Sequence, residues 1–406
     1  MEYYTAREIA DKYNVSAMTV SRWVANSQNK KNSLLLTTSN GKKFILKNSN
    51  NTAEIERLSR SGKINKPHSN IKRAKPSKTF YNAFTDEQVL TILNAIETSS
   101  EIPNKFTFVN NGAEIWDDYY VKNSINSNNY TTPNRVKRLL SSCTSYINFI
   151  SEDFNTLNVI DIGQGNALHV IDYLLRLHKK NRVSKYLALD ISEKMNNLAL
   201  KNVRKALPNI DTTSYVCDTE TSNFDKIFFV NTQEEQASKS QNLILYLGSM
   251  IGMHDDPIRV LRNFRLGMRK SDILMISNTI DSPINRVDFS YAKNPSGDRQ
   301  NTWIPENIGI DVNQCELVTK YDQETNKRKL NLKLDKNYEL SFELLGKHKT
   351  IELWKGQEIN LWKHQMSTPS MFLKQIDEAG LRLTNMCIEK DNSHMLAMCM
   401  VKDGNL

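Results

Sequence analysis

The sequence predicts an α/β fold, a doubly wound sheet with a second lobe, preceded by a small winged helix-turn-helix domain. Strand-like and helix-like runs alternate from Asn158 onward, and a glycine-containing turn follows the first of these strands, as in doubly wound sheets. A third observation sets the N-terminus apart: residues 1–80 contain 16 Lys and Arg against 5 Asp and Glu, whereas the whole chain has a net charge of +9. The excess positive charge therefore lies in the first fifth of the chain, which is typical of a region that meets a polyanion.

The first 36 residues predict two helices joined by a short turn. Thr5 and Glu8 form a capping box at the start of the first helix, and Ser16 is placed to cap the second. The apolar residues of the second helix would point inward: Val20, Trp23 and Val24. Four others would face outward, where this motif meets base edges: Ala17, Met18, Ser21 and Arg22. Residues 4–23 resemble the helix-turn-helix of excisionase-like and MerR-like DNA-binding proteins.

A wing is predicted by an Asn-Gly turn, which favours a tight hairpin, between two strand-like runs at residues 34–37 and 43–47. Its tip carries Lys42 and Lys43, which are suited to phosphate contacts. We therefore expect residues 1–61 to bind double-stranded DNA and residues 62–80 to form a flexible basic linker. Docking of this module on a protein partner or on the neighbouring domain is the alternative.

Composition excludes several classes of protein. The 406 residues suffice for two or three domains, and a hydrophobic content of 39% excludes a wholly disordered chain. The longest apolar runs fall short of the ~20 residues that span a bilayer, and the first residues show no apolar signal segment. The 5 cysteines form no Cys-x-x-Cys pair, which is typical of reduced thiols. We expect a cytoplasmic protein without a membrane partner or a bound metal, and a homodimer is compatible with the sequence.

The remaining elements follow in order along the body of the chain. Short β-branched or apolar runs predict strands at residues 159–160, 186–189, 213–217, 243–247 and 273–276. Helices are predicted at residues 167–177, from Ser192 onward and at residues 257–268. Because each helix separates two strands, the sheet is expected to be parallel.

Polar and glycine residues mark the ends of the first three predicted strands. Gly163 and Gly165 allow the backbone to approach a ligand, and Asp161 opens the same turn. Asp190 ends the second strand, where a carboxylate can accept hydrogen bonds from ribose hydroxyls. Asp218 follows the third strand, where it could contact an adenine amino group. Together these residues predict a site for a nucleoside cofactor.

The same turn distinguishes between cofactors. A dinucleotide site would carry a third glycine or an alanine at the next fixed step, where this chain has Leu168. The shorter Asp-x-Gly-x-Gly form fits S-adenosylmethionine, whose methionine end carries no diphosphate. A tight turn that binds nothing is the alternative.

Residues of about 105–406 resemble the histidine-specific S-adenosylmethionine methyltransferase family. The segments that carry the resemblance occur in the family's order, at residues 111–116, 129–133, 247–252, 356–358 and 369–381. The third of them, Leu-Gly-Ser-Met-Ile-Gly with Gly248 in it, is the most distinctive. The resemblance implies a class I methyltransferase body over residues 81–406. Its cofactor core would span about 133–280 and 366–406, and a lobe from 81–132 and 281–365 would close over an amino-acid substrate.

Departures from the family pattern concern the substrate. The family's Asn after Leu-Gly-Ser-x-Ile-Gly helps to hold the substrate's α-carboxylate, and Met253 stands here. A Glu and a Ser that hold imidazole in the family fall approximately on Trp362 and His364. Tyr130 matches a family tyrosine, and Tyr291 aligns loosely with a second one. Since sites built for polar groups reject analogues by ~10⁴-fold or more, we expect an amine acceptor other than histidine.

The resemblance also implies a mechanism. Methyl transfer from a sulfonium is an in-line displacement that needs an unprotonated nitrogen held ~3 Å from the methyl group. Tyr130 would position the acceptor, and His364, with an ordinary pKa of ~6.5, could assist its deprotonation, or His364 could serve only in packing. We interpret His254, beside two acids, as part of a helix start, and His169 as structural.

Two other functions stay open at this point. The first is a DNA-binding transcriptional regulator whose methyltransferase-like body senses S-adenosylmethionine or a small ligand. The second is a nucleic-acid-directed methyltransferase. The second is disfavoured because the chain lacks the [Asp/Asn]-Pro-Pro-aromatic motif that grips a flipped base and lacks a Pro-Cys pair.

Overall fold

The structure of this protein is a computed structural model. It describes residues 3–13, 19–20, 23–24, 36–39, 42–46, 51–52, 55–56, 71–122, 132–179, 182–230, 240–289 and 295–402. The chain forms two units. Unit 1 comprises Met1–Ile102, Ile308–Glu316 and Lys333–Ile359, and unit 2 comprises Pro103–Asn307, Leu317–Leu332 and Asn360–Leu406.

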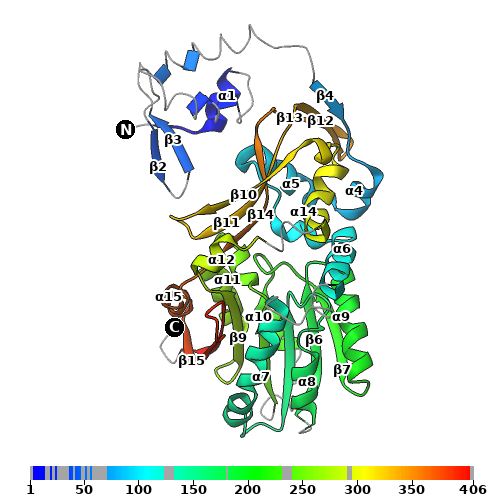
Figure 1. Ribbon diagram of the computed structural model, residues 1–406, viewed down its shortest axis with the longest axis vertical. Helices are drawn as coiled ribbons and strands as arrows, with labels where there is room; N and C mark the ends of the chain where they lie inside the picture. The colour runs from blue at the N-terminus through cyan, green and yellow to red at the C-terminus, as the bar shows by residue number, and fades with distance from the viewer. Residues whose placement is uncertain are drawn as a thin grey trace. The chain divides into compact units, whose positions relative to one another are not determined.

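A seven-stranded sheet forms the centre of unit 2 (Figure 1). Its strands are β5 (Thr156–Ile162), β6 (Val183–Asp190), β7 (Asp211–Val216), β8 (Ser240–Tyr246), β9 (Ile273–Thr279), β15 (Leu381–Ile388) and β16 (His394–Val401). Their order is β15-β16-β9-β8-β5-β6-β7, with β5 to β9 parallel and β16 antiparallel to both neighbours. This confirms the predicted doubly wound sheet, and the strand order reverses between β5 and β8. Ligands of such sheets bind outside the carboxyl ends of the strands at this switch point.

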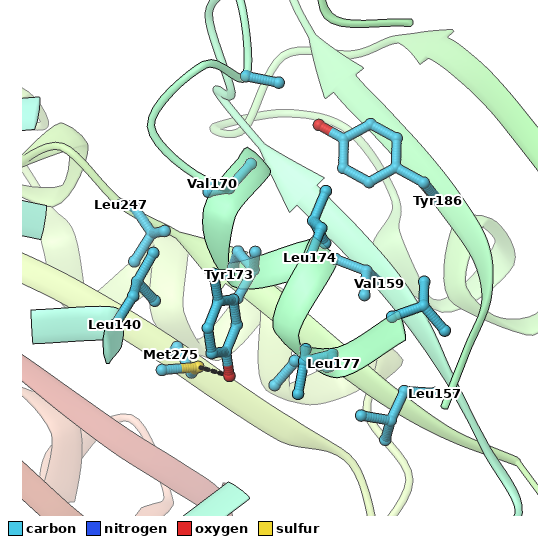
Figure 2. Close-up of a cluster of buried hydrophobic side chains, with 14 of the residues drawn as sticks. Leu140, Leu157, Val159, Val170, Tyr173, Leu174, Leu177, Tyr186, Leu247 and Met275 are labelled. Carbon is cyan, nitrogen blue, oxygen red and sulfur yellow. Dashed lines mark hydrogen bonds between the residues drawn. The ribbon is translucent and has the colours of Figure 1, made fainter. Parts of the chain in front are cut away.

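Helices cover both faces of this sheet because its buried strands alternate apolar residues between the faces. On one face, α7 (Thr132–Ile150), α8 (Ile171–His178) and α9 (Glu193–Ala206) pack against residues such as Val159. Figure 2 shows part of this cluster, with the Tyr173 hydroxyl 3.7 Å from the Met275 sulfur. On the other face, α10 (Phe224–Val230), α11 (Pro257–Gly267) and α15 (Pro369–Glu378) pack against residues such as Ile160.

Further segments of unit 2 precede the sheet or are inserted into it. They are η1 (Asn104–Phe108), α6 (Asn111–Tyr120), η3 (Met250–Met253), α12 (Pro283–Val287), α14 (Pro295–Asn307), and a small sheet of β10 (Glu316–Asp322), β11 (Lys327–Lys333) and β14 (Glu358–Gln365). The Trp303 indole of α14 donates to the Thr107 carbonyl at 3.1 Å. A Cβ on Gly112 would collide with that carbonyl, so glycine lets α6 begin against η1.

The N-terminal part of unit 1 bears out several predicted features. Its elements are β1 (Tyr3–Tyr4), α1 (Ala6–Tyr13), β2 (Leu36–Ser39) and β3 (Lys42–Leu46). Thr5 and Glu8 make both hydrogen bonds of the capping box. The residues predicted to point inward, Val20, Trp23 and Val24, are buried together with Ile9 and Ile45.

The two strands predicted for the wing pair antiparallel with shifted bounds, from Leu36↔Ile45 to Ser39↔Lys42, and their role as a wing stays a prediction. Ala17, Met18, Ser21 and Arg22 lie outside the described residues, as do the side chains of Lys42 and Lys43. The helix-turn-helix and its DNA contacts therefore stay predictions.

The rest of unit 1 corrects two predictions. Its elements are β4 (Ile71–Ala74), α4 (Lys78–Ala83), α5 (Asp86–Ser99), η4 (Val312–Gln314), β12 (Asn337–Leu344) and β13 (Lys347–Leu353). Residues 71–74 were expected in a flexible linker, but β4 pairs in parallel with β12, and Phe80 packs on Phe342 with ring centroids 6.1 Å apart. These contacts draw residues 81–102 and 333–359 into unit 1, whereas the predicted substrate lobe grouped them with residues of unit 2. No helix in the described parts of the chain is long and apolar enough to cross a membrane.

Candidate functional site

The turn that follows β5 needs its two glycines. Gly163 and Gly165 have φ values of +62° and +55°, in the left-handed region that favours glycine. A Cβ on Gly165 would collide with the ring of Trp116 from α6, and one on Gly163 would lie 3.2 Å from the Met250 Cε. The positive φ values and the neighbouring side chains of Trp116 and Met250 account for glycine at these two positions, and the approach of the turn to a ligand stays a prediction.

Two buried carboxylates lie at the ends of β5 and β6. The Tyr186 hydroxyl donates to Asp161 Oδ2 at 2.8 Å, while Asp161 Oδ1 has no hydrogen-bond partner in the described part of the chain. The Ser192 N–H donates to Asp190 Oδ1 at 2.9 Å. Burial raises the pKa of each carboxyl to about 7, and the charge of Asp190 adds to the effect on Asp161. The backbone N–H groups of Gly165 and Ile191 also donate to Asp190, so Asp161 is the one of the two with an oxygen left unpartnered among the described residues.

A chain of polar contacts continues beyond β7. Lys105 Nζ contacts Asp218 Oδ2 at 2.7 Å and Glu220 Oε2 at 2.9 Å. His254 Nδ1 donates to Glu220 Oε1 at 3.0 Å, and the Tyr246 hydroxyl contacts His254 Nε2. The hydrogen bonds from His254 and Lys105 lower the pKa of Glu220 to about 2. Asp218, predicted to contact adenine, thus already holds a lysine, and its role toward a ligand stays a prediction.

The loop that follows β8 contacts both the glycine turn after β5 and His364 of β14. Gly248 has a φ of +74°, and its N–H donates to Ser277 Oγ at 2.9 Å. Met250 lies against Gly163, as described above, while a Cβ on Gly252 would lie 2.6 Å from His364 Nε2. Met253, a predicted substrate residue, ends this segment and is half-buried. The loop formed by residues 248–253 therefore touches both the glycine turn and His364.

Trp362 and His364 come together on β14, as the resemblance implied. Their rings stack at 6.0 Å between centroids and 10° between planes, and the Arg328 guanidinium lies 5.5 Å from the Trp362 ring centroid. Burial, the charge of Arg328 and the nearby His394 hold the pKa of His364 well below its usual range. His364 is therefore neutral at pH 7 and a weak base, and this weak basicity disfavours the hypothesis that it takes a proton from the acceptor.

The remaining predicted residues fall into two groups. Tyr130 and Tyr291 lie outside the described residues, so their roles stay predictions. His169 is buried near the Tyr120 ring, and burial lowers its pKa to about 4, which agrees with a structural role. Sequence reasoning missed Lys105, and it missed three buried cationic or imidazole residues: Arg135, Arg328 and His394. No local motif marks any of these four positions.

Comparison with protein families gives one match to this chain. The family model described as histidine-specific, S-adenosylmethionine-dependent methyltransferase matches residues 85–401. No curated protein matches the chain significantly.

Solved structures similar to the chain include three methyltransferases. An S-adenosylmethionine-dependent methyltransferase from Clostridium acetobutylicum is 9% identical, with a TM-score of 0.38 over 71% of this chain and 98% of that one. Magnesium protoporphyrin IX methyltransferase from Synechocystis, with bound S-adenosylhomocysteine, is 9% identical, with a TM-score of 0.38 over 73% and 97%. 1,6-Didemethyltoxoflavin-N1-methyltransferase from Burkholderia thailandensis is 9% identical, with a TM-score of 0.36 over 79% and 92%.

Proposed function

The chain belongs to the histidine-specific, S-adenosylmethionine-dependent methyltransferase family, and from this premise we propose that it methylates the nitrogen of an amino-acid-like amine other than histidine. One observation carries the substrate part of the proposal. Where the family resemblance places a Glu and a Ser for imidazole, this chain has the buried, stacked pair Trp362 and His364. The pair offers an aromatic face and a neutral imidazole, and it lacks the carboxylate that would hold an imidazole ring.

The residues at the strand ends fit S-adenosylmethionine, which supplies a methyl group on a positively charged sulfur. Asp190 would accept hydrogen bonds from the ribose hydroxyls, and the turn of Gly163 and Gly165 would lie along the methionine end. Asp161, buried with one oxygen unpartnered among the described residues and with its pKa raised to about 7, would become fully charged on meeting a cation beside that turn. Asp218 would meet the adenine amino group.

The acceptor side holds and orients the amine rather than deprotonating it. His364 is neutral at pH 7, and its Nε2 is buried without a hydrogen-bond partner in the described part of the chain. Its Nε2 atom adjoins Gly252 in the loop after β8, which also reaches the glycine turn. In-line transfer depends on such positioning, because fixed geometry removes much of the entropic barrier.

Methyl transfer from labelled S-adenosylmethionine into a panel of amino acids and amines tests the proposal. We expect at least one amine to be methylated and histidine to be a poor acceptor. His364→Ala should lower kcat/KM about 10- to 100-fold for that amine, as expected for losing one polar contact, and the exposed-site variant Lys374→Gln serves as control. Efficient methylation of histidine would contradict the proposal.

We also propose that residues 1–61 bind double-stranded DNA. The capping box, the buried Val20, Trp23 and Val24 and the paired hairpin support a folded module, and the first 80 residues carry a net charge of +11. Fluorescence anisotropy of the full chain with duplex DNA tests this. Binding should weaken steeply with salt and fall on Lys42→Glu/Lys43→Glu, but not on Lys374→Glu.

The two open alternatives are outcomes of the same experiments. A protein that binds S-adenosylhomocysteine and DNA but methylates no acceptor would be a ligand-sensing regulator. Label that enters the DNA itself would make it a nucleic-acid methyltransferase.

A further inference from the structure

Four buried basic side chains gather beside the loop that follows β8, and we refer to them as the arginine cluster. They come from four separate elements of unit 2, namely α7, β11, β14 and β16, and are Arg135, Arg328, His364 and His394. Each side chain is less than one-tenth exposed. Buried charges of one sign are costly unless an opposite charge compensates them.

The hydrogen-bond partners found for Arg328 are neutral groups. Its Nη1 donates to the backbone carbonyls of Asn285, at 3.1 Å, and Asp288. Its Nη2 lies 3.4 Å from His364 Nδ1, and its Nε has no hydrogen-bond partner in the part of the chain that the structure describes. Burial lowers the pKa of Arg328 to about 10, despite the charge of Asp288, so the guanidinium stays positive at pH 7.

The other members do not supply the missing anion. The nearest carboxylate to Arg135 is that of Asp391, 3.9 Å away and beyond hydrogen-bond range, and Arg135 Nε is unpartnered among the described residues. Both ring nitrogens of His394 are likewise buried and unpartnered in those residues. Burial, with the charge of Arg135, lowers the pKa of His394 to about 3, so this ring is neutral at pH 7. The cluster therefore carries two positive charges, with Asp288 acting on Arg328 and Asp391 lying 3.9 Å from Arg135, and it keeps buried donor atoms that no described residue satisfies.

The position of the cluster connects it to the methyl-transfer site. His394 begins β16 and pairs with Thr279, the last residue of β9, so it lies at the same edge of the sheet as the glycine turn. His364 Nε2 abuts Gly252, two residues after Met250, which lies against Gly163. A small molecule bound at this edge could place one end toward the glycine turn and the other toward the cluster.

We infer that the methyl acceptor carries a second oxyanion, a carboxylate or a phosphate, besides its amine and the α-carboxylate of an amino acid, and that Arg328 binds this second oxyanion. The inference rests on the proposed methyl transfer to an amine. A guanidinium offers planar, paired donors that match both kinds of oxyanion. The Trp362 ring lies 5.5 Å from the guanidinium and restricts its position, and the unpartnered Nε and ring nitrogens supply further polar contacts.

Calorimetric titration of the full chain, saturated with S-adenosylhomocysteine, tests the inference with matched pairs of compounds. Glutamate against glutamine and aspartate against asparagine vary a carboxylate, and O-phosphoserine against serine varies a phosphate. We expect the acidic member of at least one pair to bind at least about 10-fold more tightly, as for a hydrogen bond to a charged group. The preferred pair tells carboxylate from phosphate.

Three variants complete the test. Arg328→Gln should abolish the preference for the acidic member, Arg328→Lys should retain part of it, and Lys374→Gln should leave it unchanged. The melting temperature of ligand-free Arg328→Gln should stay equal to or exceed that of the wild type, because an uncompensated buried charge has been removed. Absence of binding by every acidic compound, equal affinity within all pairs, or a preference that survives Arg328→Gln would overturn the inference.

Cofactor binding and methyl transfer, measured on the same preparations, separate the two possible failures. Loss of S-adenosylhomocysteine binding, or its presence without transfer to any amine, would count against the proposed function. Transfer to amines with no preference for an acidic partner group would overturn only the role of Arg328.

Discussion

The two halves of the sheet edge in unit 2 are built from opposite charges. Beyond β5, β6 and β7 lie four acidic side chains: Asp161, Asp190, Asp218 and Glu220. On the other side of the switch point, beside β8, β9 and β16, lies the arginine cluster. Both halves contain buried polar atoms without partners in the described residues. This contrast supports the two proposals made above, in which the cationic cofactor binds beside the acidic half and an anionic group of the acceptor binds beside the arginine cluster.

The acidic half contains two kinds of carboxyl group, one with a raised pKa and one with a lowered pKa, and their contributions to stability change with pH in opposite directions. Burial raises the pKa of Asp161 and of Asp190 to about 7, above the unfolded value, so folding favours their protonated forms. Their contribution to stability is fully present below about pH 4 and is lost as pH rises through 7, by up to about 4 kcal/mol for each group.

Urea unfolding of the ligand-free protein between pH 4 and pH 8 measures this effect. Asp161→Asn should remove about half of the pH dependence over that range, because Asp190 still titrates, whereas Asp211→Asn, at an exposed position, should leave it intact. If the pH dependence of the unfolding free energy is the same in Asp161→Asn as in the wild type, burial does not raise the pKa of Asp161 in the acidic half.

Substitutions in the glycine turn of the acidic half test why glycine is needed there. The cause is either the close approach of Trp116 together with the positive φ, or the positive φ alone. Gly165→Ala should destabilise the protein by about 1–3 kcal/mol, because it combines a positive φ with a collision against Trp116. Gly346→Ala, at a φ of +71° with no atom within 4 Å of its Cβ, should cost only the conformational part. Trp116→Ala should relieve part of the cost in the double variant, and equal costs at the two glycines would argue against a collision.

Glu220 provides the opposite sign of pH dependence within the same half. Its pKa is lowered to about 2 by His254 and Lys105, so its stabilisation is present above about pH 4.5 and is lost as pH falls toward 2. Glu220→Gln should cost about 1.5 kcal/mol at pH 7, the lower range for a hydrogen bond to a charged group. The same variant at pH 3 should differ less from wild type, and an unchanged difference would remove the ion-pair explanation.

Local patterns in the sequence predict much of this fold. The parallel strands, the glycine turn and the Thr5–Glu8 capping box were predictable because each depends on residues close together in the chain. Asp190 could be placed at the sheet edge by the same reasoning, because a strand-ending residue needs no distant partner to be located.

Contacts between distant residues were not predictable. Lys105 meets Asp218 across 113 positions, and Arg328 meets His364 across 36, with no motif at either end. Similarly, β4 has the polar sequence Ile-Lys-Arg-Ala and was interpreted as linker, because only its pairing with β12 makes it a strand.

The central claim is that the acidic half binds the nucleoside cofactor through Asp190, and calorimetric titration with S-adenosylhomocysteine tests it most directly. We predict saturable binding to the wild type and to Asp211→Asn. Asp190→Asn should bind about 1,000-fold more weakly, as expected for the loss of two charge-assisted hydrogen bonds. No heat of binding with the wild type, or equal affinity for Asp190→Asn, would contradict the account.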